Sequence, residues 1–191
     1  MRKIVFDIET KNFFGDTGSN DPASLDLSLV CTYDYETDRY DSFFEQDLGH
    51  LWPVLEQADL IIGFNSDHFD IPLLNKYYAG DLSKIKSLDI LKEIKKACGR
   101  RVSLNQISHA TLGKKKLGHG SDAMTWWKNG DLESLKKYCL EDVKITKEVY
   151  DYARTHHLLK YSENGLTREI PLATGKWEEK ATQGLTFTLP F

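Results

Sequence analysis

Long hydrophobic runs are scarce in this chain of 191 residues. The longest purely apolar stretches, such as residues 60–62, are far too short to cross a bilayer, so we expect no membrane-spanning helix and no membrane partner. A signal peptide is not expected either, because Asp7 interrupts the apolar stretch that follows Arg2 and Lys3. These absences favour a globular protein that folds in water.

Cysteine is scarce as well. Cys31, Cys98 and Cys139 are scattered with no CxxC spacing, which favours free thiols in a reducing compartment over a disulfide framework or a zinc site. We therefore expect a cytoplasmic protein. Hydrophobic residues make up 40% of the chain and charged residues 28%, which are ordinary values for a soluble globular protein with one well-filled domain.

Acidic residues are scarce in one segment, residues 84–116, which holds ten Lys or Arg against Asp89 and Glu93. The whole chain has a net charge of −4, so this segment carries +8 and the remainder −12. A basic stripe of this kind can follow a phosphate backbone, or it can be the solvated face of a helix. An active site for phosphates nearby would favour the first interpretation.

The order of the predicted elements indicates an α/β protein. Strands are predicted at 4–10, at 24–45 (two antiparallel strands with a turn near 36–38), at 59–65 and at 84–91. Helices are predicted at 49–58, just after Asp70, up to about 97, at 103–113 and from 132 to about 156, with a loop at 11–24. Strands that later alternate with helices predict a mixed β-sheet flanked by helices. We expect this domain to span residues 1–157, and residues 158–191 to form an appendage of turns and short strands.

The first predicted strand, IVFDIET, carries two acids on one face. Side chains on a strand alternate between its two faces, so Asp7 and Glu9 lie on the same face and the neighbouring isoleucines on the other. Two carboxylates on so apolar a strand repel each other. Another feature of the protein must therefore offset this repulsion.

The clearest predicted helix begins after Gly130, with Asp131 as its N-cap. One stripe of this helix has spacings of 3, 4, 3 and 4 and faces the core: Leu135, Tyr138, Asp142, Ile145 and Val149. An unpaired buried charge costs several kcal/mol, so Asp142 needs a cation, a hydrogen-bond network or a proton. A salt bridge to a lysine at the margin of the stripe would meet the same need.

A fourth acid, Asp70, follows a predicted strand in the stretch GFNSDHFDIPLL, where it either caps the next helix or joins the other acids. Acids on a strand, after a strand and on the core face of a helix can converge in one α/β domain. Four carboxylates without a thiolate or imidazole set form a hard oxygen site that suits Mg²⁺ or Mn²⁺. Two such ions can activate a water for phosphodiester cleavage and would offset the repulsion between Asp7 and Glu9.

Three stretches, FDIET, GFNSDHFD and YCLED, resemble in order the three exonuclease motifs of the DEDDy 3′–5′ exonucleases. This family belongs to the ribonuclease H-like superfamily and includes the proofreading domain of family B DNA polymerases. The stretch SLNQISHATLGKKK also resembles the segment before the third motif in the polymerase-like branch. The resemblance covers roughly residues 1–155 and implies the ribonuclease H-like fold.

The resemblance also implies roles for individual residues. Asp7, Glu9 and Asp142 would ligate two ions, Mg²⁺ or Mn²⁺. Asp70 would complete the acidic cluster, in part through water, and Tyr138 would orient the attacking water. Together with the basic stripe, the resemblance suggests these substrate contacts: Thr10, Phe13, Phe14, Asn65, Lys114, Lys115 and Lys116. The two phenylalanines can stack on a base or can cover the underside of their own loop.

The implied activity is hydrolysis of phosphodiester bonds at the 3′ ends of single-stranded nucleic acid, with DNA preferred, and release of 5′-mononucleotides. An RNA-directed 3′–5′ exoribonuclease and a catalytically silent nucleic-acid-binding module are the alternatives. Catalysis is favoured because all five motif residues are present, whereas degenerate relatives usually lose motif acids. The choice between DNA and RNA depends on backbone shape and access to the 2′-OH, so it stays open.

Overall fold

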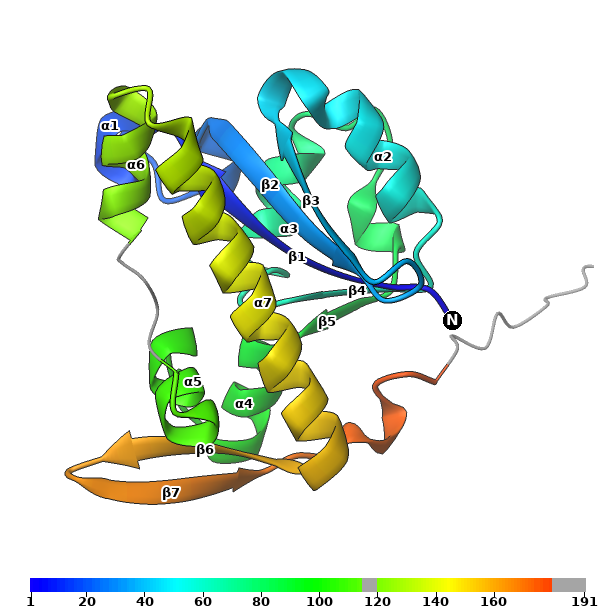
Figure 1. The fold of residues 1–191 in the computed structure, drawn as a ribbon, viewed down its shortest axis with the longest axis vertical. Coiled ribbons are helices and arrows are strands. Elements are labelled where there is room, and N and C mark those ends of the chain that lie inside the picture. The colour runs from blue at the N-terminus through cyan, green and yellow to red at the C-terminus, as the bar shows by residue number, and fades with distance from the viewer. Residues whose placement is uncertain (115–119, 180–191) are drawn as a thin grey trace, which may run out of the picture.

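A five-stranded sheet lies at the centre of the structure, a computed structural model that describes residues 1–114 and 120–179 (Figure 1). Its strands in chain order are β1 (Lys3–Thr10), β2 (Leu27–Asp34), β3 (Arg39–Phe44), β4 (Leu60–Gly63) and β5 (Ser87–Asp89). Their spatial order is β3-β2-β1-β4-β5, and β1 runs antiparallel to β2 and parallel to β4. The predicted mixed sheet is therefore confirmed.

Helices flank this sheet on both faces (Figure 1). In the described residues they are α1 (Phe14–Thr17), α2 (Leu48–Glu56), α3 (Asp70–Asn75), α4 (Ile90–Cys98), α5 (Leu104–Leu112), α6 (Gly120–Lys128) and α7 (Leu132–His156). None of them combines the length and the apolar character that crossing a bilayer requires. The strands and helices that the sequence predicts from residue 27 to 113 are all present within a few residues of their expected bounds.

Two helices differ from the expectation. The stretch 11–24, expected as a loop, contains α1 and a 3₁₀ turn at Pro22–Ser24. Helix α1 was not predicted because a single helical turn is too short to produce an apolar period. The Asp16 carboxylate stabilises this turn by accepting the Phe13 N–H at 2.8 Å. Helix α6 was not predicted. It buries only Ala123 and Met124 fully, so its apolar stripe is weak in the sequence.

The alternation of β1 separates two cores. Its isoleucines and Phe6 pack against α2 and α3, whereas Val5 packs on the opposite face with α5 and α7. Figure 1 shows α7 crossing β1 and β2 on that second face, with its C-terminal end extending past the sheet. Asp7 and Glu9 therefore share the face that α7 covers, as the period of two predicts.

Helix α7 follows its predicted bounds. The Asp131 side chain accepts the Ser134 N–H at 3.1 Å and caps the first turn, and the chain leaves the helix at His157 in the left-handed region (φ 58°). All five residues of the predicted stripe are buried: Leu135, Tyr138, Asp142, Ile145 and Val149. Tyr138 and Asp142 are thus brought to the inner face of the helix, toward β1.

The chain after α7 forms a hairpin of β6 (Leu158–Glu163) and β7 (Leu166–Pro171). Its turn places Asn164 and Gly165 at positive φ (52° and 77°), a conformation that these two residue types adopt most readily. Leu159 and Ile170 are buried in the core on the α7 side of the sheet. The hairpin also bonds to α5, where the Thr111 hydroxyl accepts the Lys160 N–H at 2.9 Å. The described part of the segment after residue 157 therefore shares a core with the preceding residues.

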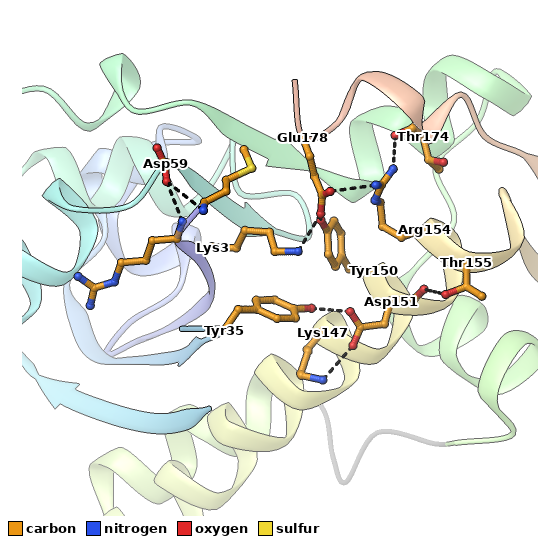
Figure 2. Close-up of polar contacts among 12 residues, drawn as sticks. Lys3, Tyr35, Asp59, Lys147, Tyr150, Asp151, Arg154, Thr155, Thr174 and Glu178 are labelled. Carbon is orange, nitrogen blue, oxygen red and sulfur yellow. Dashed lines mark hydrogen bonds and ion pairs between the residues drawn. The ribbon is translucent and has the colours of Figure 1, made fainter. Parts of the chain in front are cut away.

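Beyond the hairpin, Glu178 fastens the chain to β1 and α7 (Figure 2). Its carboxylate accepts hydrogen bonds from the Lys3 ammonium at 2.7 Å, the Arg154 guanidinium at 2.9 Å and the Tyr150 hydroxyl. Partial burial opposes the ionisation of Glu178, but the hydrogen bonds from Lys3 and Tyr150 outweigh it and lower the pKa from 4.5 to about 2. Three segments distant in sequence thus meet at one carboxylate.

Replacing Glu178 by Gln should destabilise the protein at pH 7, because Lys3 and Arg154 would lose their shared negative partner. The expected loss is about 1–3 kcal/mol, which lowers Tm by roughly 2–10 °C for a chain of this size. A carboxyl with a lowered pKa stabilises the fold above pH 4.5, and that contribution is lost as the pH falls toward 2. Thermal melts at pH 7 and pH 3 should show the difference between parent and variant shrinking at the lower pH.

Glu179→Gln is the matched control, because the neighbouring carboxyl is exposed. The role assigned to Glu178 is wrong if both variants melt alike at pH 7, or if the Glu178→Gln difference is the same at both pH values.

Candidate active site

The site lies where the parallel strands β1, β4 and β5 end. Strand β1 pairs with β4 only through Lys3–Val5, while β1 itself continues to Thr10. The overhanging half of β1 therefore borders the segment 64–70 that follows β4, instead of another strand. Carboxyl ends of parallel strands meet at one edge of a sheet, so side chains from β1 and from the segment after β4 converge there.

The two acids of β1 lie close together on the overhang. The carboxylates of Asp7 and Glu9 and the sulfur of Cys139 all lie within 4.8 Å of one another. Glu9 is buried, and Asp7 is partly exposed. The expectation that the acids share a face is met, and this face is covered by α7.

Cys139 was not predicted as part of the site. Its thiol donates to the Asp7 carbonyl oxygen at 3.6 Å, and Cys31 lies opposite Asp7 in the pairing of β1 with β2. Burial raises the pKa of the Cys139 thiol well above its usual range, and Cys31, Asp7 and Glu9 raise it further. The thiol is thus held in its neutral form. The only available sequence signal was its place beside Tyr138, which by itself does not indicate a position next to the acids.

Asp142 and Tyr138 approach the same carboxylates from α7. Asp142 is 3% exposed, one helical turn after Tyr138. Burial raises the pKa of the Tyr138 phenol, and the negative charges of Asp142, Glu9 and Asp7 raise it further, in that order. Tyr138 consequently keeps its proton and lies within the field of all three acids. The structure therefore brings together four of the five residues that the motifs predict.

The fifth residue, Asp70, approaches β1 from the side. It is the first residue of α3, which has Phe69 as its N-cap, so the interpretation of Asp70 as a simple helix cap is wrong. Burial raises the pKa of this carboxyl from 3.8 to about 8, against hydrogen bonds from the backbone of Asp70 itself and of Ile8, and the charge of Asp89 adds to the rise. Ile8 stands between Asp7 and Glu9, so Asp70 contacts the overhang between the two acids.

The donor set fits a hard divalent cation. Three carboxylates gather around Tyr138, a fourth carboxyl contacts the strand between two of them, and the nearby sulfur is a protonated thiol. Carboxylate oxygens are the ligands that Mg²⁺ and Mn²⁺ prefer, whereas zinc sites use thiolate and imidazole. Asp7, Glu9, Asp142 and Asp70 are the residues that would hold such ions.

An open cavity of about 250 Å³ adjoins Glu9. We name it the aromatic cavity, and its lining includes Glu9, Thr10, Phe13, Phe14, Phe69 and Met124. Phe13 is 47% exposed, so it does not cover the underside of its loop. Phe14 does pack inward, edge-to-face on Phe69 at 6.1 Å between ring centroids. The Thr10 hydroxyl donates to the Asn12 carbonyl at 3.0 Å. Three predicted substrate contacts thus surround one cavity beside an acid.

The other predicted substrate contacts lie elsewhere. Asn65 is in the left-handed region (φ 69°), and its side-chain oxygen accepts a hydrogen bond from Arg101 at 2.8 Å. The Lys114 ammonium pairs with Glu148 of α7 at 2.6 Å, so this lysine has a carboxylate partner within the protein. Lys115 and Lys116 lie outside the described residues. Contacts of these lysines with a substrate stay predictions.

The sheet order and the acids on β1 and α7 define a class of protein. A family model described as the RNase_H superfamily matches residues 4–154, so the chain belongs to the RNase H superfamily. Among solved structures, the chain is similar to the family B DNA polymerase from the hyperthermophilic archaeon Pyrobaculum calidifontis, with a TM-score of 0.63 and 16% sequence identity. No curated protein matches the sequence.

The similarity to the polymerase covers 80% of this chain and 24% of the polymerase chain, so this chain spans about a quarter of the polymerase's length. At 16% identity the likeness shows the fold alone. The resemblance to family B DNA polymerases that the three motifs predict is confirmed at this level.

Asp70→Asn should make the protein more stable than the parent in EDTA as the pH rises. A carboxyl whose folded pKa is raised from 3.8 to about 8 keeps a proton that the unfolded chain releases, so stability falls between these pH values. Asparagine cannot ionise, so the stability of the variant does not fall for this reason as the pH rises. Urea unfolding at pH 5 and pH 9 should show a relative gain for the variant of roughly 1–3 kcal/mol, within the range common for single substitutions.

Asp41→Asn serves as the control, because Asp41 is exposed on the edge strand β3. Equal pH dependence in the parent and in Asp70→Asn would contradict the buried, protonated carboxyl.

Proposed function

We propose that this protein is a metal-dependent 3′–5′ exonuclease that hydrolyses single-stranded nucleic acid, with DNA as the preferred substrate, and releases 5′-mononucleotides. The proposal rests on one observation above all. The carboxylates of Asp7 and Glu9 lie within 4.8 Å of each other. Their charges and that of Asp142 raise the pKa of the Tyr138 phenol. These are the residues that the three exonuclease motifs imply.

The acids supply the ion site in this proposal. Asp7, Glu9 and Asp142 would hold two Mg²⁺ or Mn²⁺ ions, and Asp70 would complete the cluster from the side of β1. When bound, such ions make water more acidic and stabilise the charge that develops on the attacking and leaving oxygens. The raised pKa of Asp70 indicates that this carboxyl would release its proton when a cation arrives.

The remaining residues would position the 3′ end of the nucleic acid. The aromatic cavity would take the terminal nucleoside, with Phe13 in position to stack on the base. The protonated Tyr138 hydroxyl would donate a hydrogen bond that orients the attacking water. The water oxygen bonds to phosphorus, the bond from phosphorus to the 3′ oxygen breaks, and the proton passes to that oxygen. The released nucleotide keeps its 5′-phosphate, and the shortened strand ends in a 3′-OH.

Asp7→Ala should reduce cleavage roughly 10²–10³-fold or more, because the substitution removes a charged group on which transition-state stabilisation depends. The measurement is a gel of 5′-labelled DNA and RNA oligonucleotides with Mn²⁺, Mg²⁺ or EDTA. The parent should give a ladder that shortens with time, faster on DNA, and no ladder in EDTA.

Asp41→Ala, which removes an exposed carboxylate from β3, should behave as the parent. Cleavage that persists in EDTA or in Asp7→Ala would rule out the mechanism, and a first product that is a 5′-labelled mononucleotide would reverse the polarity. Faster cleavage of RNA would make the protein an exoribonuclease. If the parent binds both strands but cleaves neither with either metal, the catalytically silent module is the correct interpretation.

Tyr138→Phe should lower kcat by about 10²–10⁴-fold, the range typical of a group that positions or transfers a proton. The binding of Mn²⁺, measured by calorimetry, should stay close to that of the parent because the phenol is not an ion ligand in this proposal. Tyr152→Phe is the control on the same helix, since Tyr152 lies against His156 and outside the acidic cluster. A Tyr138→Phe protein that is as fast as the parent would reduce Tyr138 to a packing residue.

A further inference from the structure

A second cavity opens at the same edge of the sheet, beside the segment 64–70. It measures about 400 Å³ and is lined by Asn65, Asp67, His68, Asp89, Leu91, Lys92, Lys95 and Arg101. We name it the cationic cavity. His68 lines this cavity and the next residue, Phe69, lines the aromatic cavity. Both cavities therefore adjoin one short segment, which continues into Asp70.

The carboxylates of the cationic cavity are already engaged. Asp67 pairs with Lys92 at 2.8 Å and accepts the Ser87 hydroxyl at 2.5 Å. Asp89 accepts backbone N–H groups from Asn65 at 2.8 Å and Leu91 at 2.9 Å, so it closes the loop after β4 onto the start of α4. These acids organise the wall of the cavity.

Two cations remain. Among the described residues, no carboxylate pairs with Lys95 or Arg101, and both side chains are exposed. Helix α4 ends at Cys98, and its C-cap Gly99 adopts the left-handed conformation (φ 75°) and turns the chain. After this turn, Arg100 pairs with Glu163 of β6, whereas Arg101 lines the cavity. The fold thus separates two adjacent arginines, one for a structural ion pair and one for the cavity.

Arg101 is also held in place. One of its terminal N–H groups donates to the Asn65 side-chain oxygen at 2.8 Å, and Asn65 is itself fixed through its backbone bond to Asp89. A guanidinium has five donors in a rigid fork, so a single bond to a neutral amide leaves donors for an oxyanion. An ordered guanidinium beside a lysine is a setting that suits a phosphate.

We propose that the cationic cavity binds a backbone phosphate of the nucleic-acid strand on the 5′ side of the bond that is cut. This inference rests on the proposed function. At a 3′ end, the terminal nucleoside has a phosphate on one side only, and that phosphate must lie at the acids. With the nucleoside in the aromatic cavity, every further phosphate lies on the far side of the acids. The cationic cavity borders the segment 64–70 that continues into Asp70, and in this proposal it receives the first of these phosphates.

Lys95→Ala combined with Arg101→Ala should therefore weaken the use of long substrates more than that of short ones. The short substrate is the p-nitrophenyl ester of thymidine 5′-monophosphate, which has one phosphate and no upstream strand, and the long substrate is oligo(dT). The ratio of kcat/KM for oligo(dT) to kcat/KM for the ester should fall about 10–100-fold, the loss expected for one or two charged hydrogen bonds.

Lys84→Ala combined with Lys96→Ala is the matched control, because it removes the same charge from exposed positions of the same basic segment that do not line the cavity. Its ratio should equal that of the parent. Arg101→Lys should restore part of the ratio, because the charge returns without the fork.

Binding supplies a second measurement, independent of cleavage. The affinity for 3′-blocked oligo(dT) in EDTA should depend less steeply on salt in the double variant, with a slope that is smaller by about 0.7 for each phosphate that the protein no longer neutralises. Equal loss on both substrates, or a salt slope equal to that of the control, would overturn the cationic cavity while leaving the nuclease intact. A parent that cleaves neither substrate would overturn the proposed function, and the salt slopes would then decide on the cavity alone.

Discussion

The repulsion between two carboxylates on the covered face of the central strand is the constraint on which the rest of this structure depends. Asp7 and Glu9 lie within 4.8 Å of each other beneath α7, where charges are screened less than in water. Three neighbouring groups that could add negative charge are kept neutral by burial, because the pKa values of Tyr138, Cys139 and Asp70 are all raised. Without a cation, the fold limits the charge at this point.

Strand and helix periods predicted the faces on which four residues of the candidate site lie. The period of two places Asp7 and Glu9 on one face of β1, and the apolar stripe of α7 places Tyr138 and Asp142 on the inner face of that helix. Neither assignment needs a tertiary contact. The position of Cys139 beside the acids could not be predicted in this way, because it depends on how α7 is rotated about its axis against β1 and β2. The same holds for the bond between Arg101 and Asn65, which joins residues 36 positions apart. Local patterns carry no information on such pairs.

The segment after α7 illustrates another limit. The sequence predicts turns and short strands after residue 157, and the described part of this segment contains the β6–β7 hairpin, with Asn164 and Gly165 in its turn. Composition did not reveal that this segment contributes Leu159, Ile170 and Trp177 to the core, or that Glu178 returns to the first residues of β1. A polar, glycine-containing segment can still supply a few buried side chains, and only the three-dimensional packing identifies them.

Strand β1 is longer than β4, so the parts of the candidate site come from different segments of the chain. Five residues of β1 extend past its last pairing with β4, which is about 16 Å of strand. This overhang carries Asp7 and Glu9, whereas both cavities are lined in part by the connecting segments at 11–14, at 64–70 and after α4. Such connections tolerate substitutions and insertions far better than a central strand does. Under the proposed function, a protein built on this plan can therefore change which nucleic acid it prefers by changing its loops, while the acids on β1 stay as they are.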